Sequence, residues 1–231
     1  MATCVTVEKK ISMSLFEDLK IQAQKMLEPQ SSSASISAEE MADRNVKLKE
    51  TYHYWREFAE LIKVIKPDFS DPIHLATIGD MTDMKISNPY SDYRLKTQMN
   101  QNFYDEIDYV TMYFFYKAPQ EFSFKKEVGA LTTRVKDLLW RHGIVHTARE
   151  LKNKLERVVE VDFNIPWQVK GSVTVTPLAQ SRILHFSLKN IGKLGEVEFE
   201  IPFEKINIIF LDELSKLMMG QDNRFWKLVK S

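Results

Sequence analysis

Cysteine is almost absent from this chain of 231 residues: the one cysteine, Cys4, has no second thiol with which to form an internal disulfide. Low cysteine content without disulfides is typical of a reducing compartment, so we expect a cytoplasmic protein. A nucleophilic thiol needs a base or a positive field beside it, and no histidine is close to Cys4 in sequence. We therefore expect no catalytic role for Cys4.

Long hydrophobic runs are also missing. The two longest, Tyr109–Tyr116 and Ile206–Leu211, are far shorter than the roughly 18 apolar residues that cross a bilayer. The first ten residues lack the apolar core of a signal peptide. From the sequence we expect a soluble protein with no membrane partner.

The chain carries no excess of either charge, because its 32 basic residues balance its 32 acidic ones. The field of the whole molecule therefore does not attract nucleic acid, although a local basic patch still can. Glycine is scarce as well, and the phosphate-binding pattern G-x-x-x-x-G-K-[ST] does not occur. This matters for Asp212 and Glu213, which follow an apolar run as the magnesium-binding acids of nucleotide hydrolases do. Without the phosphate loop, we interpret Asp212 as the N-cap of a helix that ends at Gly220, and Glu213 as a first-turn acid.

The N-terminal part is predicted to be helical. One helix follows Ser14 and stops before Pro29, a serine-rich linker covers 29–37, and a capping box of Ser37 and Glu40 opens a second helix from about Ala38 to Lys66. We assign 1–66 to an N-terminal helical region and 67–231 to an α+β domain. Apolar residues at spacings of three and four form a wide stripe on the second helix, which we predict to bind a protein partner or a second copy: Leu48, Tyr52, Trp55, Phe58 and Ile62.

After Pro67 the apolar period changes to two, which is typical of strands. Residues 93–103 read as a half-buried strand, 109–116 as a central strand, and the stretches between 159 and 203 as an antiparallel meander. A helical pair interrupts the sheet: one helix follows Pro119 and ends at Gly143, and a capping box of Thr147 and Glu150 opens a short second one. The predicted fold class is α+β: an N-terminal helical hairpin, a mainly antiparallel sheet interrupted by a helical pair, and a short C-terminal helix.

The segment 124–157 is locally basic, and Trp140 lies within it. Its cations and its tryptophan are the residue types that hold phosphates and stack on bases. Four acidic residues interleave with them, as on an ordinary solvated face, so both interpretations stay open. The residues that we name as possible nucleic-acid contacts are Lys125, Lys126, Arg134, Arg141, Arg149 and Lys152.

No catalytic residue, metal ligand or cofactor is predicted. His142 and His146 have the spacing of two ligands on a helix, but Gly143 between them breaks the helix and no third ligand is implied. Alternating acids at 196–200 and at 160–162 are interpreted as solvated strand faces, with cation binding as the alternative. The tyrosines between Tyr90 and Tyr116 are interpreted as sheet packing, with a small-ligand pocket as the alternative.

Together these features predict a non-catalytic cytoplasmic interaction module that self-associates or binds a protein partner through the helix at 38–66. The alternative is a nucleic-acid-associated protein, a nuclease or an accessory factor, that uses the basic segment 124–157.

Overall fold

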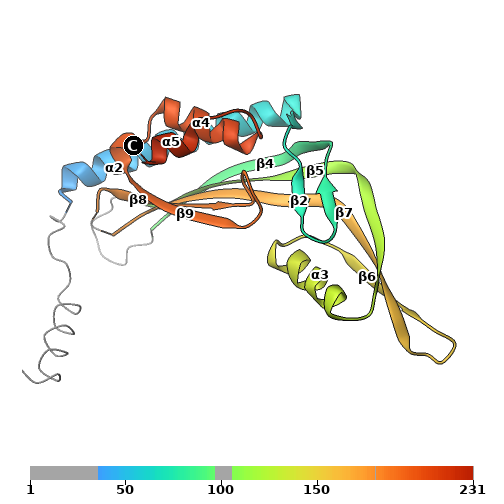
Figure 1. The fold of residues 1–231 in the computed structure, drawn as a ribbon. Coiled ribbons are helices and arrows are strands. Elements are labelled where there is room, and N and C mark those ends of the chain that lie inside the picture. Colours follow the sequence, from blue (N-terminus) through green and yellow to red (C-terminus); the bar gives the residue numbers. More distant parts are fainter. Residues whose placement is uncertain (1–35, 97–105, 180, 231) are drawn as a thin grey trace, which may run out of the picture. The chain divides into compact units, whose positions relative to one another are not determined.

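The structure is a computed structural model that describes residues 36–96, 106–179 and 181–230, and the chain from Ile36 onward forms one compact unit. This unit combines four α-helices with a curved antiparallel sheet, which confirms the predicted α+β class (Figure 1). The first helix of the predicted hairpin and most of the serine-rich linker lie outside the described residues.

Helix α2 (Ala38–Ile65) begins and ends where the sequence predicts. The Ser37 hydroxyl accepts from the backbone N–H of Glu40, and the Glu40 carboxylate accepts from that of Ser37, so the capping box is confirmed. Lys66 ends the helix in a left-handed conformation, φ 47°, directly before Pro67. The helix lies in the same compact unit as the sheet and packs on its central strands.

The main sheet has the strand order β1-β4-β5-β7-β8-β9, with β6 paired to β7, and all its pairs are antiparallel. A small hairpin of β2 and β3 precedes β4. The strands have the following bounds: β1 Asp68–Phe69, β2 Ile73–Leu75, β3 Gly79–Met81, β4 Met84–Leu95, β5 Ile107–Glu127, β6 Thr147–Lys152, β7 Val158–Pro177, β8 Ile183–Lys189 and β9 Glu196–Pro202. The central strand predicted at 109–116 is confirmed as part of β5.

One face of the sheet is covered by α2, α4 (Ile208–Met218) and α5 (Phe225–Lys230), as Figure 1 shows. Alternate residues of β5 point to this side: Val110, Met112, Phe114 and Tyr116 are fully buried. The Tyr116 hydroxyl donates to the Met218 carbonyl at 2.8 Å, which ties the central strand to the end of α4.

The predicted start of the last helix is wrong. α4 begins at Ile208, where the Asn207 side chain accepts from the Phe210 N–H. Asp212 therefore lies inside the helix and pairs with Lys216 at 2.9 Å. Glu213 is buried, and it accepts from Lys216 and from the backbone N–H of Arg224, just before α5. Both hydrogen bonds lower the pKa of Glu213, the one from Arg224 more strongly.

The predicted helical pair is half right. β5 continues to Glu127, so its helix, α3, covers only Ala130–Arg141. Gly143 follows it with φ 65°, which is the left-handed position that the sequence indicates. The second predicted helix is instead strand β6, paired to β7 from Thr147 to Lys152. The ladder that β7 offers outweighs a local capping signal in a short segment, because a short helix is only marginally stable without packing.

The sheet bends where two of its ladders are interrupted. The register of β4 against β5 shifts between Ser87 and Tyr90, and that of β5 against β7 shifts between Lys117 and Glu121. A proline lies inside each interruption, Pro89 in the first and Pro119 in the second, and proline cannot donate to a ladder. Bulges increase local twist and bend a strand. Beyond the bend, β5, β6 and β7 continue alone.

Candidate functional site

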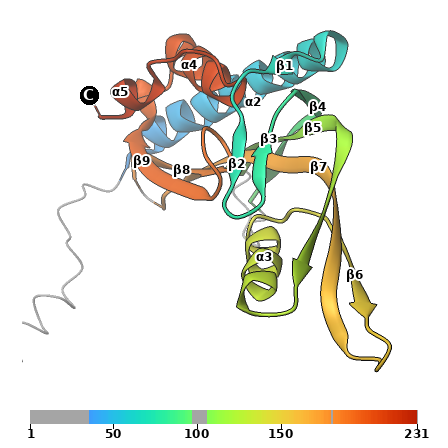
Figure 2. The same cartoon turned by 45° about the vertical axis from the view of Figure 1, so that its right-hand side comes forward.

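The segment 124–157, predicted from its composition, forms one structural projection of the sheet. We call residues 121–165 the arm: the last part of β5, helix α3, strand β6, and the first part of β7. The rest of the described chain is the body. In Figure 2 the arm extends away from the helices of the body, with α3 on the side opposite to them. All six predicted nucleic-acid contacts lie on the arm: Lys125 and Lys126 on β5, Arg134 and Arg141 on α3, and Arg149 and Lys152 on β6.

Helix α3 is held by a narrow buried face. Thr132, Val135 and Leu139 are buried, and the Thr132 hydroxyl donates to the Glu127 carbonyl. The turn after the helix is fixed by Asn190 of the body, whose side-chain amide donates to the His142 carbonyl at 3.4 Å and to the Lys170 carbonyl at 2.9 Å. This packing leaves the opposite face of α3 in solvent.

That opposite face carries Trp140, whose residue surface is 83% exposed. Arg134 and Arg141 are exposed on the same helix. A tryptophan buries a large area wherever it packs, so one this exposed on a helix that already has its own buried face is available to a ligand. Lys136 and Asp137, four and three residues before Trp140, are its neighbours on the helix surface. An exposed indole on an element that also carries cations is suited to stack on an unpaired base whose phosphates the cations hold.

The far end of the arm is a hairpin loop between β6 and β7. The Asn153 side-chain oxygen accepts from the backbone N–H groups of Leu155 and Arg157, at 2.9 and 3.1 Å, and Glu156 is left-handed with φ 60°. These bonds satisfy the turn from within, so the long side chains of the loop are not needed to hold it. Lys152, Lys154 and Arg157 are exposed there.

The cations of the segment 124–157 share one property: within the residues that the structure describes, none forms an ion pair with a carboxylate. Nine Lys and Arg residues stand against four Glu and Asp residues, a difference of five positive charges, in a chain of zero net charge. The remaining residues therefore carry five net negative charges. The cations are Lys125, Lys126, Arg134, Lys136, Arg141, Arg149, Lys152, Lys154 and Arg157.

On the strands of the arm, an acidic residue lies next to two of the cations. Asp162 on β7 lies between Lys125 on β5 and Arg149 on β6 in the ladder register. This row weakens the positive field on the strands. The cations of α3 and of the hairpin loop have no such row, and they are the stronger candidates for binding an anion.

The predicted partner-binding stripe of α2 is placed differently. Leu48, Trp55 and Ile62 are buried in the core of this chain, and Tyr52 and Phe58 pack against it. A partner can reach the three buried side chains only if α2 leaves the sheet. Partner binding through this stripe stays a prediction.

His142 and His146 do not converge with the acidic strands, whereas His185 of β8 lies 3.9 Å from Glu198 and 3.9 Å from Glu200 of β9. His142 ends α3, where burial, followed by Arg141 and Lys189, lowers its pKa, and the His146 ring contacts the Ile144 carbonyl. The acids of β9, Glu196, Glu198 and Glu200, face β8, while Glu160 and Asp162 lie in the arm. Among the described residues there is no group of three or more His, Cys, Asp or Glu side chains that could hold a metal ion.

The aromatic run of β4 and β5 is divided by the alternation of the strands. Phe114 and Tyr116 are in the core, and Tyr90 and Tyr113 contact each other on the opposite face, with ring centroids 5.3 Å apart. This matches the interpretation of these residues as sheet packing.

Comparison of the chain with protein-family models, with curated proteins and with solved structures found no match. None of the described helices is long and apolar enough to span a membrane.

Proposed function

We propose that this chain is a non-catalytic binding protein that contacts single-stranded nucleic acid through the arm. The observation that carries the proposal is that nine cations and an exposed tryptophan lie on one projection of the fold, and that none of these cations forms an ion pair with a carboxylate of the described residues. The second of the two functions that the sequence left open was a nucleic-acid-associated protein, a nuclease or an accessory factor, and the proposal keeps only its binding part. Its residues are accessible, whereas most of the stripe on α2 is occupied by the core.

A polyanion would supply the negatively charged partners that these cations do not have among the described residues. Lysine and arginine side chains that neutralise phosphates release condensed counterions, which drives binding without reading sequence. Stacking of a base on an aromatic ring adds about 1–3 kcal/mol and requires an unpaired base. Because Trp140 projects from a helix surface, single-stranded nucleic acid fits the arm better than a duplex whose bases are stacked.

Fluorescence anisotropy with a labelled single-stranded RNA or DNA tests the proposal. A loop variant, Lys152→Ala with Lys154→Ala and Arg157→Ala, removes three exposed cations from the arm. The matched control, Arg56→Ala with Lys205→Ala and Lys227→Ala, removes three exposed cations from the body, none of which pairs with a carboxylate of the described residues. If each loop cation neutralises one phosphate, the loop variant binds roughly 100-fold more weakly at 0.1 M salt.

A Trp140→Ala variant separates stacking from charge. It is expected to weaken binding about fivefold or more without changing the dependence on salt, since no cation is lost. Absence of binding at low ionic strength refutes the proposal, as does an equal loss of affinity in the body control. A duplex bound as tightly as the single strand refutes the assignment to unpaired bases.

A further inference from the structure

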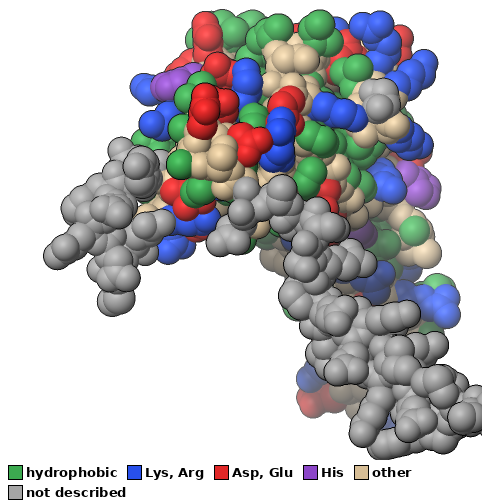
Figure 3. All heavy atoms as spheres, turned by 90° about the vertical axis from the view of Figure 1, so that its left-hand side faces the viewer, with side chains coloured by type: hydrophobic (Ala, Val, Ile, Leu, Met, Phe, Trp, Pro, Cys, Tyr) green, Lys and Arg blue, Asp and Glu red, His purple; other side chains and the backbone are tan. Residues whose placement is uncertain are grey.

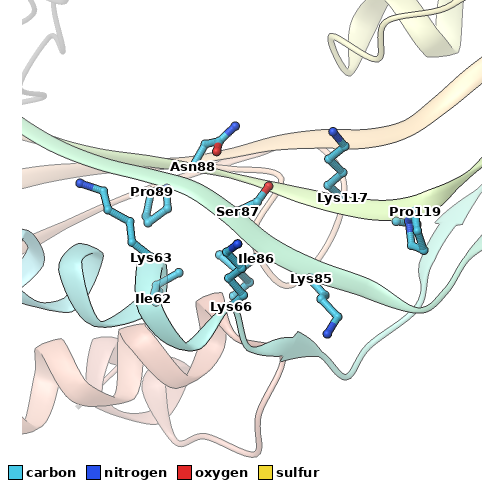
Figure 4. A pocket seen from close by; sticks show the side chains of 11 residues that line it. Ile62, Lys63, Lys66, Lys85, Ile86, Ser87, Asn88, Pro89, Lys117 and Pro119 are labelled. Carbon is cyan, nitrogen blue, oxygen red and sulfur yellow. The ribbon is translucent and has the colours of Figure 1, made fainter.

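A second surface, at the bend of the sheet, carries positive charge for a different reason. A cavity of about 490 Å³ lies between the last turn of α2, the bulge of β4 and the bulge of β5. This is within the size range of small-molecule sites. Four of its lining residues are lysines and none is acidic: Lys63, Lys66, Lys85 and Lys117. We call it the lysine pocket (Figure 4).

The apolar part of the lysine pocket comes from the irregular ladders. Ile62 of α2, Ile86 of β4 and Ala118 of β5 line it and are buried, and Pro89 and Pro119 lie at the two ladder interruptions. Asn88 takes a left-handed conformation, φ 49°, which lets β4 step out of register. The bulges thus open a space that regular strands would close, and they line it with carbon.

The four lysines are not equivalent. Lys63 pairs with Glu60 at 2.7 Å, and Lys85 pairs with Asp68 at 3.3 Å. Among the described residues, neither Lys66 nor Lys117 has a carboxylate within ion-pair distance. Two uncompensated positive charges therefore border one apolar cavity.

The register places Lys85 and Lys117 directly opposite each other across β4 and β5. Their side chains diverge in Figure 4, and Lys85 pairs with Asp68. The charge of Lys85 is therefore compensated within the chain, and Lys117 is the member of this pair that has no carboxylate partner among the described residues.

The lysines of the pocket lie beside its apolar lining. Lys63 and Lys66 border the same cavity as Ile62, Ile86 and Ala118. Such a lining suits an amphiphile, since a lysine stem covers carbon while its ammonium group reaches the charged head.

From this combination we propose that the lysine pocket binds an amphipathic anion: an alkyl chain on Ile62, Ile86 and Ala118, with a phosphate or carboxylate head held by Lys66 and Lys117. The source of such a ligand is either a free amphiphile or a lipid of an anionic bilayer. This site is separate from the arm, and neither proposal depends on the other.

Isothermal titration calorimetry with decyl phosphate, below its micelle-forming concentration, tests the site. Decanol and inorganic phosphate are the half-ligands. Decyl phosphate is expected to bind at least tenfold more tightly than either, because only it satisfies both the carbon and the charge. Equal affinity for decanol overturns the proposal, as does the absence of decyl phosphate binding.

The variant Lys66→Ala with Lys117→Ala is expected to weaken decyl phosphate binding at least tenfold and to leave decanol binding unchanged. Its control, Lys205→Ala with Lys227→Ala, removes two exposed lysines elsewhere and should retain the affinity. Equal losses in the two variants overturn the assignment. Methyl NMR then locates the ligand: shifts at Ile62, Ile86 and Ala118 support the site, and shifts confined to other methyl groups contradict it.

Flotation with phosphatidylcholine vesicles, with and without phosphatidic acid, identifies the source. Co-flotation that depends on phosphatidic acid and on Lys66 and Lys117 assigns the site to a bilayer lipid. Binding of decyl phosphate without such flotation assigns it to a free amphiphile.

Discussion

The body and the arm differ in how many of their cations form ion pairs. In the body, nine of the nineteen described Lys and Arg residues pair with a carboxylate; for example, Arg44 binds Glu106, and Arg182 joins Glu40 of α2 to Glu204. On the face of the body shown in Figure 3, acidic and basic side chains are interspersed. In the arm, among the described residues, none of the nine cations of 124–157 has such a partner. Ion pairs therefore contribute to the stability of the body, whereas the cations of 124–157 contribute none among the described residues.

The two regions also differ in where they place tryptophan. Trp55 on α2 is fully buried, and Trp140 on α3 is 83% exposed. Trp55→Ala is expected to lower the free energy of unfolding by about 3–5 kcal/mol, because it removes a large core side chain and leaves a cavity. Trp140→Ala should change it by less than about 0.5 kcal/mol. Urea unfolding monitored by circular dichroism checks both, and equal losses would show that Trp140 is part of the core.

A smaller effect is expected at the buried ion pair of the body. Arg44 is 1% exposed, and it donates to the Leu178 and Ser181 carbonyls, at 2.8 and 2.7 Å, as well as to Glu106 at 3.0 Å. Burial lowers the pKa of Arg44, while Glu106 opposes that shift. Arg44→Met removes the donor of two carbonyls and leaves Glu106 with Lys96 alone, at 2.7 Å, among the described residues, and should cost about 3 kcal/mol.

The exposed ion pairs of Arg182 with Glu40 and Glu204 provide the control for the buried Arg44. Arg182→Met breaks a surface network and should cost no more than about 1 kcal/mol. Thermal unfolding of the two variants at the same salt concentration makes the comparison. A larger loss at Arg182 than at Arg44 would reverse the order that burial predicts.

Glycine substitutions compare the packing of the two regions. A Cβ on Gly171 in β7 would lie 2.8 Å from the ring of Phe114, which is fully buried and unable to retreat. Gly171→Ala should therefore destabilise the protein by about 1–3 kcal/mol. Gly129 in the arm has extended backbone and open space around it, so Gly129→Ala should be close to neutral. Denaturant midpoints measure both, and a neutral Gly171→Ala would mean that β5 and β7 pack less closely than described.

The smallest effect concerns pH. The pKa of Glu213 is lowered in the folded state by the hydrogen bonds from Arg224 and Lys216. A carboxyl group with a depressed pKa stabilises the fold above its unfolded pKa, and this contribution is lost as the pH falls through the folded pKa. Glu213→Gln should thus be less stable than wild type at pH 7, with the difference shrinking below about pH 4. Melting temperatures across this pH range check it, and a constant difference would mean that Glu213 titrates alike in both states.

Local signals predicted the body better than the arm. The capping box at Ser37 and the stripe through Trp55 both read correctly as helix, because they depend on neighbours within a few residues. The segment at Thr147 carried a similar capping signal, yet it forms strand β6. Its first residue, Thr147, pairs with Asn164 of β7, which is not a close neighbour in sequence. In the body, the sequence did not predict the start of α4. The cap is Asn207, and the aliphatic run that follows it from Ile208 has a composition that favours sheets.

The two candidate sites also differ in whether neighbours in sequence or distant residues form them. The basic segment 124–157 is continuous in sequence, so its composition alone marked it. The lysine pocket draws on Lys63, Lys66, Lys85 and Lys117, which three elements bring together only after the sheet bends. No spacing in the sequence indicates it. The two prolines that interrupt the ladders were visible, but their effect depends on which strands become neighbours.

The central claim is that the cations of the arm are reserved for a polyanion, and the salt dependence of binding tests it most directly. For wild type, the logarithm of the association constant for a single strand should fall linearly with the logarithm of salt concentration. Substituting alanine for Lys152, Lys154 and Arg157 should reduce the slope by about 2, at roughly 0.7 per lost phosphate contact, while the body control keeps the wild-type slope. Identical slopes for the three proteins would contradict the account.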